Sequence, residues 1–321
     1  MGETRLNALI IGAGSIGGLI DSPASNAVAS HAHAYTLCPE TQLSAICEPS
    51  ELNVFAFMER WGEVHRYFSI DDVSADEYYD IASISSSTAS HFRDLTTLLK
   101  RTDCSMILCE KPIVASKEEF HSLISALQNS DKKILIHLMR RYNKAFIELS
   151  ERIKNDEFGK ALGFQGVCTK GLLHNGSHLL GVLSHFLGHL SAIKPFKASH
   201  CNGDLCGEFG ISLKNGDGNI SVLRSPDYSL FELTVWFEKG VVKILEGGDK
   251  IEIYSRVPSS TYEGYFSLTL KESITTNLSR YALDSVEFLI RENDQTCNEI
   301  FKEHLHLHEL IFQAFIKVYP S

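Results

Sequence analysis

Two charged residues and a proline follow a short apolar run near residue 110. The run is Met106–Cys109, and Glu110, Lys111 and Pro112 come directly after it. An apolar run of this length is typical of a buried strand, and a charged pair followed by proline ends one. Pro112 restricts Lys111 to extended conformations, so the amine is held at the strand tip, the end at which open α/β sheets bind ligands. The pattern indicates either an amine placed for chemistry or a solvated lysine before a turn.

A glycine-rich turn follows the first apolar run of the chain, residues 5–11. Gly12 makes the tight turn, Gly14 lets the backbone approach a pyrophosphate, and Gly17 lets the next helix pack closely. The start of that helix offers N–H groups and a positive dipole end to phosphates. A position directly after a strand is the context that a dinucleotide-binding fingerprint requires. The turn reads Gly12-Ala13-Gly14-Ser15-Ile16-Gly17.

A second strand, predicted over residues 42–47, ends at Glu48. An acidic side chain there accepts hydrogen bonds from both ribose hydroxyls of NAD and repels the 2′-phosphate of NADP. The distance from the glycine turn is longer than usual because residues 19–30 form an insertion, which we interpret as a surface loop or a flap over the cofactor. A helix is predicted from about Ser30 to Leu37.

The remaining elements up to residue 138 alternate between strand and helix, which predicts a parallel, doubly wound sheet. A strand near residue 80 leads into a serine-rich loop, Ser85 to Ser87, and a helix from His91 to Lys100. Ser116 and Glu119 form a capping box that opens a helix to about Gln128. One more strand is predicted over residues 133–137.

Length, charge and cysteine usage restrict the class of protein. A chain of 321 residues predicts two domains, which we place at 1–138 for dinucleotide binding and 139–321 for substrate binding and oligomerisation. A net charge of −10 argues against a nucleic-acid partner, and no apolar stretch is long enough to span a membrane. The N-terminus lacks the layout of a signal peptide. Eight scattered cysteines without a Cys-x-x-Cys motif predict reduced thiols and a cytoplasmic protein.

The second domain is predicted to be α+β, with a large and mostly antiparallel sheet. Helices are expected up to about residue 154, over 177–190, over 280–293 and over about 299–318. Strands are expected over 161–170, 208–213, 218–224, 229–237, 241–246 and 250–255, and the turns between the later ones read as antiparallel hairpins.

The segment Gly171-Leu-Leu-His174-Asn175-Gly176-Ser-His178 adds a fourth motif to the glycine turn, the serine loop and the strand end. Together the four resemble the glucose–fructose oxidoreductase / inositol dehydrogenase (Gfo/Idh/MocA) family, over residues 5 to about 190. The resemblance implies a cis Lys111–Pro112 bond and a histidine acid/base at His178. The sequence departs from the family where His174 and Gly181 replace two aspartates and Ser87 replaces a frequent proline. The segment also resembles a subgroup associated with surface-polysaccharide sugar pathways.

The resemblance implies a role for each residue that occupies a matching position in the four motifs. The implied cofactor-binding residues are Gly12, Gly14, Ser15, Ile16, Gly17, Glu48, Ser85, Ser86, Ser87, His91 and Glu110. Glu110 has a second interpretation, as a structural residue that satisfies backbone groups. Lys111 and His178 are the implied catalytic pair, and Arg141, Lys170, His174 and Asn175 the expected substrate contacts. His174 either substitutes for the missing aspartate by binding substrate or is an ordinary loop residue.

The chemistry implied is oxidation of a carbinol, which needs a base for the hydroxyl proton while hydride leaves carbon. Lys111 can act as this base if desolvation favours its neutral form. His178 titrates near neutrality, so it is better suited to accept and return the proton. The histidines at 178, 185 and 189 share a helical face, and His304 and His308 form an i, i+4 pair. No carboxylate or cysteine completes a ligand set near them, so no metal is expected.

The sequence therefore predicts an oxidoreductase that uses NAD(H) in preference to NADP(H) on a sugar, nucleotide-sugar or polyol. Two alternatives stay open, a cofactor-binding regulator that has lost the chemistry and an NAD-dependent glycosidase. The expected partners are a small carbohydrate substrate and further copies of the chain, as a homodimer or homotetramer through the C-terminal sheet, with no nucleic acid and no membrane.

Overall fold

The structure is a computed structural model that describes residues 5–74, 76–128, 130–224 and 227–318. The chain divides into two compact units. The first contains residues 1–139 together with 279–302, and the second contains 140–278 together with 303–321. A helical segment from late in the chain thus belongs to the first unit rather than the second.

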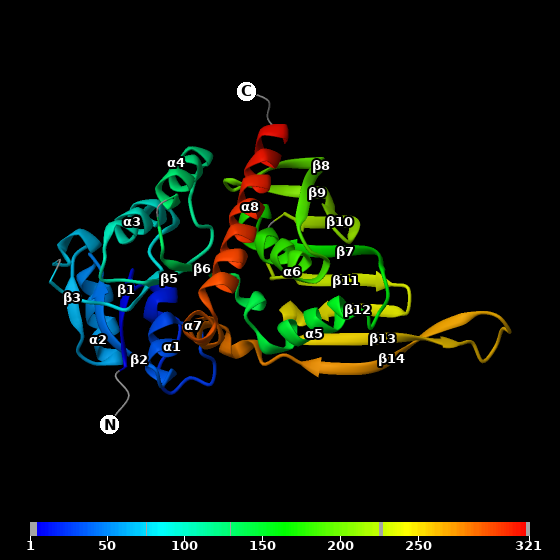
Figure 1. Ribbon diagram of the computed structural model, residues 1–321, viewed down its shortest axis with the longest axis horizontal. Helices are drawn as coiled ribbons and strands as arrows, with labels where there is room; N and C mark the ends of the chain where they lie inside the picture. The colour runs from blue at the N-terminus through cyan, green and yellow to red at the C-terminus, as the bar shows by residue number, and fades with distance from the viewer. Residues whose placement is uncertain (1–4, 75, 129, 225–226, 319–321) are drawn as a thin grey trace. The chain divides into compact units, whose positions relative to one another are not determined.

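The first unit is built on a six-stranded parallel sheet (Figure 1). Its strands are β1 (Leu6–Ile11), β2 (Thr41–Cys47), β3 (His65–Tyr67), β4 (Ile81–Ile84), β5 (Met106–Cys109) and β6 (Lys133–Ile136). The spatial order is β3-β2-β1-β4-β5-β6, and every neighbouring pair is parallel. The order reverses at β1, so the carboxyl ends of β1 and β4 flank the topological switch point where such sheets bind ligands. The predicted doubly wound sheet is confirmed.

Helices of the first unit begin at polar caps. They are α1 (His31–Leu37), α2 (Glu51–Trp61), α3 (Thr88–Lys100), α4 (Lys117–Leu127) and α7 (Tyr281–Arg291). Ser30, Ser50 and Ser116 each accept a hydrogen bond from a backbone N–H of the first turn. The capping box differs in one detail, because the Glu119 carboxylate accepts from Ala115 N at 2.8 Å instead of Ser116 N. Helix α2 and strand β3 were not predicted.

The insertion between the glycine turn and α1 is an ordered loop held by the buried carboxylate of Asp21. Asp21 Oδ2 accepts hydrogen bonds from Ala29 N at 2.6 Å and Ser30 N at 3.0 Å. The loop is also fixed to α7 and to the turn before it, since Tyr281 OH donates to Ala29 O at 2.9 Å and Val28 N donates to Ser279 O at 2.8 Å. These bonds support the interpretation of the insertion as a fixed surface loop.

The second unit contains an eight-stranded mixed sheet. Its strands are β7 (Ala161–Thr169), β8 (Leu190–Cys201), β9 (Asp204–Leu213), β10 (Gly216–Leu223), β11 (Phe231–Phe237), β12 (Gly240–Leu245), β13 (Lys250–Pro258) and β14 (Phe266–Thr275). The order is β14-β13-β12-β11-β7-β10-β9-β8. The predicted large, mostly antiparallel sheet is confirmed. The three predicted hairpins, β9–β10, β11–β12 and β12–β13, are confirmed as antiparallel pairs. Strand β7 lies between β10 and β11 and pairs with β10 in parallel. The long strands β8 and β14 were not predicted.

Helices α5 (Lys144–Lys154), α6 (Ser177–Leu187) and the second half of α8 (Asp294–Val318) cover one face of this sheet (Figure 1). All eleven residues of α6 are buried, as expected for a helix packed against both the sheet and other helices. No helix among the described residues has the length and apolar character needed to cross a bilayer.

Candidate functional site

A cavity of about 490 Å³ lies in the first unit at the carboxyl ends of β1, β2 and β4. The elements that form it are the glycine turn, the end of β2 and the serine loop after β4. A volume of this size is typical of small-molecule and cofactor sites. The residues that line it include Gly12, Gly14, Ser15, Ile16, Glu48, Pro49, Asn53, Phe68, Ser69, Ser85, Ser86, Ser87, Arg93 and Asp94.

Each glycine of the turn meets a different neighbour. A Cβ on Gly12 would lie 2.4 Å from Ser86 N, and one on Gly17 would lie 2.0 Å from Gly12 O. Gly12 also has φ +93°, a left-handed conformation that favours glycine. A Cβ on Gly14 would meet nothing within 4 Å, so it would project into open space at the cavity wall. Gly12 and Gly17 are therefore required by packing within the protein, whereas Gly14 keeps the cavity open for a ligand.

Glu48 connects the end of β2 to the glycine turn. Its Oε2 accepts a hydrogen bond from Ala13 N at 2.9 Å, and its Oε1 accepts one from Ser50 N at 2.9 Å. A carboxylate offers about four lone-pair sites, so each oxygen keeps capacity for another donor. Glu48 can thus fix the turn and still accept hydrogen bonds from ribose hydroxyls in the cavity.

The serine loop is held against the glycine turn by its own hydroxyl groups. Ser85 Oγ donates to Gly12 O at 2.8 Å, and Ser86 Oγ donates to Asp94 Oδ2 at 2.6 Å. Burial raises the pKa of Asp94 from its ordinary value, while the Ser86 hydrogen bond opposes that shift. Ser87 lines the cavity at the beginning of α3. The loop therefore presents small side chains to the cavity from a fixed backbone.

His91 lies behind this loop and does not appear in the cavity wall. Its ring is buried, with Nδ1 2.8 Å from Pro112 O and Nε2 3.0 Å from Ser86 O. Both partners are carbonyl oxygens, which only accept, so both contacts are satisfied when each ring nitrogen carries a proton. His91 thereby ties the serine loop to the segment after β5.

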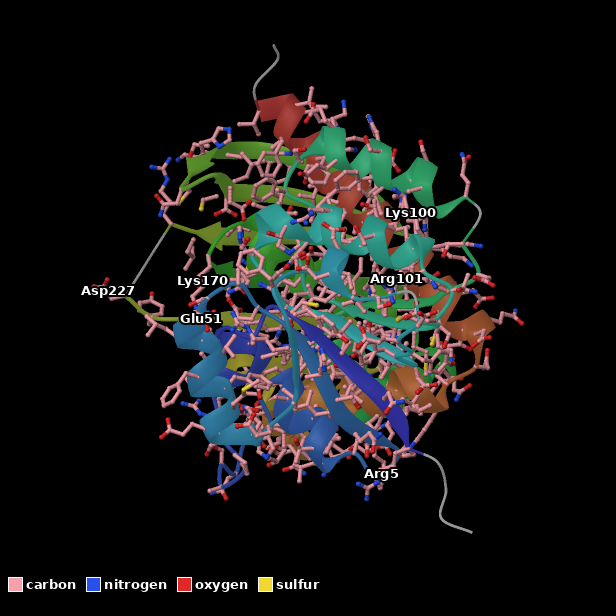
Figure 2. The ribbon with its side chains drawn as sticks, turned by 90° about the vertical axis from the view of Figure 1, so that its left-hand side faces the viewer. Arg5, Glu51, Lys100, Arg101, Lys170 and Asp227 are labelled. Carbon is pink, nitrogen blue, oxygen red and sulfur yellow. The ribbon has the colours of Figure 1, made fainter. Side chains whose placement is uncertain are left out.

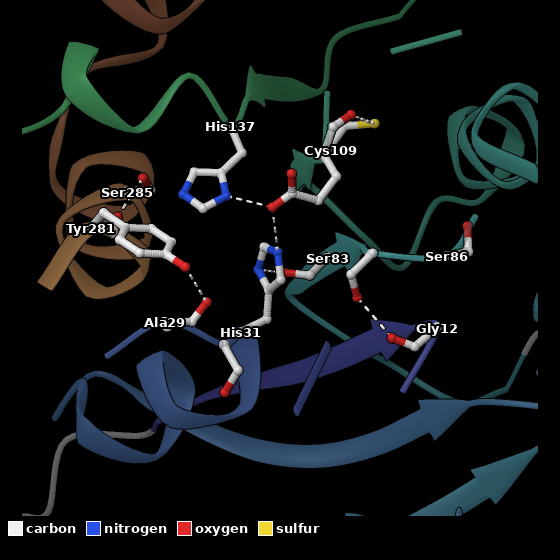
Figure 3. Close-up of polar contacts among 12 residues, drawn as sticks. Gly12, Ala29, His31, Ser83, Ser86, Cys109, His137, Tyr281 and Ser285 are labelled. Atoms are coloured by element: carbon white, nitrogen blue, oxygen red, sulfur yellow. Dashed lines mark hydrogen bonds and ion pairs between the residues drawn. The ribbon is translucent and has the colours of Figure 1, made fainter. Parts of the chain in front are cut away.

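The end of β5 places Lys111 and Glu110 in different surroundings. The Lys111–Pro112 bond is cis, which confirms the expectation from the family resemblance. The Glu110 carboxylate contacts two histidines, which are labelled in Figure 3: its Oε1 lies 2.6 Å from His137 Nδ1 and 3.2 Å from His31 Nε2. The other ring nitrogen of His31, Nδ1, lies 2.9 Å from Ser83 Oγ.

Electrostatics favour an ionised Glu110 carboxylate. Burial alone would raise the pKa of Glu110, but the neighbouring His137 and the hydrogen bonds from both rings hold that pKa well below its ordinary value. Burial lowers the pKa of His31. The facing atoms of the three residues lie within 4.8 Å of one another, close enough to surround a metal ion. The same contacts are hydrogen bonds in which Glu110 Oε1 is the shared acceptor.

In the second unit, the turn between β7 and α6 carries the histidine motif. It comprises a five-residue helical turn, η4 (Leu172–Gly176), which continues into α6. His178 lies in the first turn of α6 and is buried, with 7% of its surface exposed. His174 has its Nδ1 2.9 Å from Asp204 Oδ2 and its side chain half-exposed. The structure thus supplies an acidic partner for this motif from β9, a part of the chain that the sequence did not connect with it.

The other expected substrate contacts lie in varied environments. Lys170 is exposed, with φ +68°, and is labelled in Figure 2. Asn175 N donates to Gly171 O at 3.1 Å within the turn. The guanidinium of Arg141 is directed instead at His185 Nε2, at 3.2 Å, and burial lowers its pKa. Arg141 therefore contacts the helical layer of the second unit.

Several site residues were not identified from the sequence. His137 follows an apolar run directly, the same strand-end signal that singled out Lys111. Asp204 and Asp94 carry no local signal, because each acts on a segment at a distance in the chain that only the folded structure brings near. The further cavity residues Asn53, Ser69 and Arg93 belong to elements around α2, β3 and α3 that line the same space.

This geometry defines the class of protein: a Rossmann-type dinucleotide-binding unit joined to an α+β unit built on a large sheet. Residues 6–138 match the model of the oxidoreductase family with an NAD-binding Rossmann fold. The N-terminal domain of the chain is thus similar to the Gfo/Idh/MocA oxidoreductases.

Known proteins similar to this chain include several dehydrogenases. Inositol 2-dehydrogenase of Salmonella typhimurium is 24% identical over 127 residues, which is 39% of this chain and 37% of that protein. The chain therefore matches well under half the length of this relative. A levoglucosan dehydrogenase in complex with NADH and L-sorbose is 13% identical with a TM-score of 0.76, covering 97% of each chain. A dehydrogenase from Chromobacterium violaceum is 13% identical with a TM-score of 0.77, covering 98% of this chain and 96% of that one. At these identities the two structures show a shared fold.

Proposed function

We propose that the protein is an oxidoreductase that transfers a hydride between NAD(H) and a carbohydrate-type alcohol or ketone. The observation that carries this proposal is the cavity of about 490 Å³ bounded by the glycine turn, Glu48 and the serine loop. Its position at the switch point of a parallel sheet, within a domain of the NAD-binding oxidoreductase family, supports a dinucleotide as the ligand.

The residues of the cavity fit NAD(H). The open space beside Gly14 accommodates a pyrophosphate close to the backbone, and the first turn of η1 (Ser15–Leu19) presents N–H groups there. Glu48 would accept hydrogen bonds from the adenosine ribose, and its negative charge disfavours the 2′-phosphate of NADP(H). We therefore propose NAD(H) as the preferred cofactor, which when bound accepts or donates the hydride.

The oxidation that we propose needs one base, which takes up the proton of the substrate hydroxyl group. In oxidation, the substrate C–H bond breaks with its electron pair leaving as hydride for the nicotinamide ring, the O–H bond loses its proton to a base, and the C–O bond becomes a carbonyl. We propose Lys111 and His178 as the residues that handle this proton. An ammonium or imidazolium returns the proton to oxygen in the reverse direction.

The substrate class follows from the known dehydrogenases of this fold. The inositol 2-dehydrogenase relative and the levoglucosan dehydrogenase structures are named for a polyol and a sugar derivative. We propose a sugar, nucleotide-sugar or polyol for this chain, and a place in surface-polysaccharide sugar biosynthesis is the finer form of this proposal. It is supported by the His-Asn-Gly-Ser-His segment at residues 174–178.

The test is hydride transfer by the purified protein. NADH and NADPH are incubated with a panel of keto-sugars, and NAD with inositols, levoglucosan and nucleotide-sugars, while the absorbance of the reduced nicotinamide is followed. We expect turnover with NADH or NAD, and Lys111→Ala should lower kcat by about 10²–10⁴-fold with NADH affinity retained. Lys117→Ala, six residues further on in α4, is the matched control. An inactive wild-type protein, or a fully active Lys111→Ala variant, would contradict the proposal.

We also propose that the protein is a homo-oligomer that pairs through the open face of the second-unit sheet. A cross-strand row links Trp236 to Val241, Tyr254 and Leu270 by register, and the Trp236 and Leu270 side chains are 39% and 48% exposed. Exposed large apolar side chains gathered on a sheet face favour a protein interface. Light scattering coupled to size-exclusion chromatography should give a dimer or tetramer, and Trp236→Glu should shift it toward the monomer.

A further inference from the structure

A histidine and an aspartate from separate elements of the second unit form a close pair. His174 lies in η4, and Asp204 begins β9 thirty residues later. The His174 Nδ1 and Asp204 Oδ2 atoms are 2.9 Å apart, and the two side chains are 47% and 4% exposed. A buried carboxylate therefore holds one edge of an imidazole whose remaining surface faces outward.

The contacts of Asp204 determine which ring nitrogen carries the proton. Its Oδ2 accepts from His174 N at 3.0 Å, and its Oδ1 accepts from Leu173 N at 2.9 Å and Leu205 N at 2.6 Å. Every one of these partners is a backbone N–H, so the carboxylate acts as an acceptor throughout. The ring must then donate through Nδ1, which leaves a lone pair on Nε2 in the neutral imidazole.

The turn is shaped around this carboxylate. A Cβ on Gly171 would lie 2.1 Å from Asp204 Oδ2, so only glycine leaves room for the side chain. Lys170 and Gly171 have φ values of +68° and +87°, consecutive left-handed conformations that bring the following N–H groups of the turn to the carboxylate. The backbone conformation of the turn before His178 thus accommodates the His174–Asp204 pair.

We propose that Nε2 of His174 accepts a hydrogen bond from a hydroxyl group of a polyhydroxylated substrate, and that Asp204 is the positioning residue that fixes this tautomer. The inference rests on the proposed function and extends it to the recognition of the substrate. Here a carboxylate acting through an imidazole supplies an acceptor four residues before His178.

Replacement of Asp204 by asparagine separates positioning from a purely structural role. Asparagine offers one acceptor oxygen and one donor amide, so it no longer supplies acceptors to both the backbone N–H groups and the ring. With an amide N–H facing Nδ1, the ring takes the opposite tautomer and Nε2 becomes a donor. A residue that merely closed the turn would change stability without reversing this hydrogen-bond character.

The first measurement is spectroscopic and uses the whole protein. In ¹⁵N-histidine-labelled protein, long-range nitrogen–proton correlation spectra report the tautomer of each ring, and loss of one signal in His174→Asn assigns it. We expect the Nδ1–H form in the wild type and its loss in Asp204→Asn. An Nε2–H form in the wild type would overturn the inference. His306→Gln, a histidine of the same unit bound to Leu190 O, is the matched control.

The second measurement compares an active substrate with its monodeoxy analogues. We expect the wild type to prefer the full substrate by at least about tenfold in kcat/KM at one hydroxyl position. His174→Asn and Asp204→Asn should bring that ratio close to one, while His306→Gln should retain it. If Asp204→Asn fails to bind NADH, His174→Asn carries the test because it keeps the Asp204 contacts with the backbone.

The outcomes distinguish the two proposals. An active wild type whose deoxy ratios are unchanged in both variants contradicts the role of His174 and leaves the proposed function intact. A wild type that binds NADH yet turns over no substrate contradicts the proposed function, and this inference falls with it.

Discussion

At the scale of single residues, Gly14 and Gly18 allow a matched test of the cofactor cavity. A Cβ on Gly14 would meet nothing within 4 Å, whereas one on Gly18 would lie 2.3 Å from the Phe57 ring. We expect Gly14→Ala to weaken NADH binding at least about tenfold while stability changes by less than about 0.5 kcal/mol, because the new methyl group occupies ligand space only. Gly18→Ala should cost about 1–3 kcal/mol of stability through overpacking.

Fluorescence titration with NADH and urea unfolding monitored by circular dichroism measure the two effects. Should Gly14→Ala bind NADH as tightly as the wild type, the space beside the glycine turn would not be where the pyrophosphate lies.

Glu48 gives a prediction about cofactor choice. Glu48→Gln keeps one acceptor oxygen for the two backbone N–H groups of Ala13 and Ser50, and it removes the negative charge at the end of β2. We expect the ratio of NADPH to NADH affinity to rise about tenfold, equivalent to about 1.4 kcal/mol, because the repulsion of a 2′-phosphate is relieved. Glu51→Gln is the control, since Glu51 is exposed and paired with Arg66. Dissociation constants for both cofactors in each variant are the measurement, and an unchanged ratio would show that Glu48 does not face the 2′ position.

The sequence could predict the residues of this site whose signals are local. The glycine turn, Glu48 and the serine loop each follow a strand directly, so the rule that ligands bind at strand ends is enough to locate them. Asp204 could not be found this way, because its partner His174 lies thirty residues earlier. The sequences around His174 and around Asp204 contain no signal that the two side chains are in contact. The same holds for His31, whose link to Glu110 spans 79 positions.

At the scale of secondary-structure elements, the insertion at residues 19–30 is expected to contribute to stability. Asp21→Ala would leave the buried N–H groups of Ala29 and Ser30 without their acceptor, and each such loss costs about 1–3 kcal/mol. We expect a decrease of about 3 kcal/mol in the free energy of unfolding, measured by urea denaturation. Ser22→Ala is the control, because Ser22 bonds only with Ser25 inside the loop.

A flap would give a different result from a fixed loop. If Asp21→Ala left stability unchanged and altered only the rates of NADH binding and release, the insertion would be a mobile cover and its bonds to α7 would be of little consequence.

Elements with a strong local pattern were predicted well, and elements defined by distant pairing were not. Strand β5 and helix α6 coincide with strongly apolar segments, and α1 begins one residue after its predicted start. Strand β14 was missed although Phe266, Leu268 and Leu270 alternate with polar residues, and its side chains are almost all exposed. The position of β7 between β10 and β11 depends on pairing across more than fifty residues, for which neither turn chemistry nor periodicity gives a signal.

At the scale of the whole molecule, a group of buried histidines in the second unit makes stability depend on pH. Burial lowers the pKa values of His185, His304 and His308, that of His308 to about 4. His308 Nδ1 is bonded to His304 O at 2.8 Å, and its Nε2 has no hydrogen-bond partner among the described residues. A proton added at His308 Nε2 would therefore be buried without a hydrogen-bond acceptor among the described residues.

The direction of the effect follows from proton linkage. The unfolded chain binds a proton at His308 near pH 6.5, whereas the folded chain does so only near pH 4, so the unfolded state holds more protons between these values. Stability is full above about pH 6.5 and falls as the pH drops toward 4. For His308 alone the loss at pH 5 is about 2 kcal/mol, at 1.36 kcal/mol per pKa unit.

His308→Leu removes this titration and keeps an apolar side chain at the position. The free energy of unfolding of the variant minus that of the wild type is measured by urea unfolding at pH 5 and at pH 8. We expect this difference to be about 2 kcal/mol larger at pH 5. His306→Leu, two residues earlier on α8 and part-exposed, should keep the pH dependence of the wild type. If the two variants showed the same change with pH, the acid sensitivity would lie elsewhere, and His308 would be either hydrated in solution or already protonated in the folded protein.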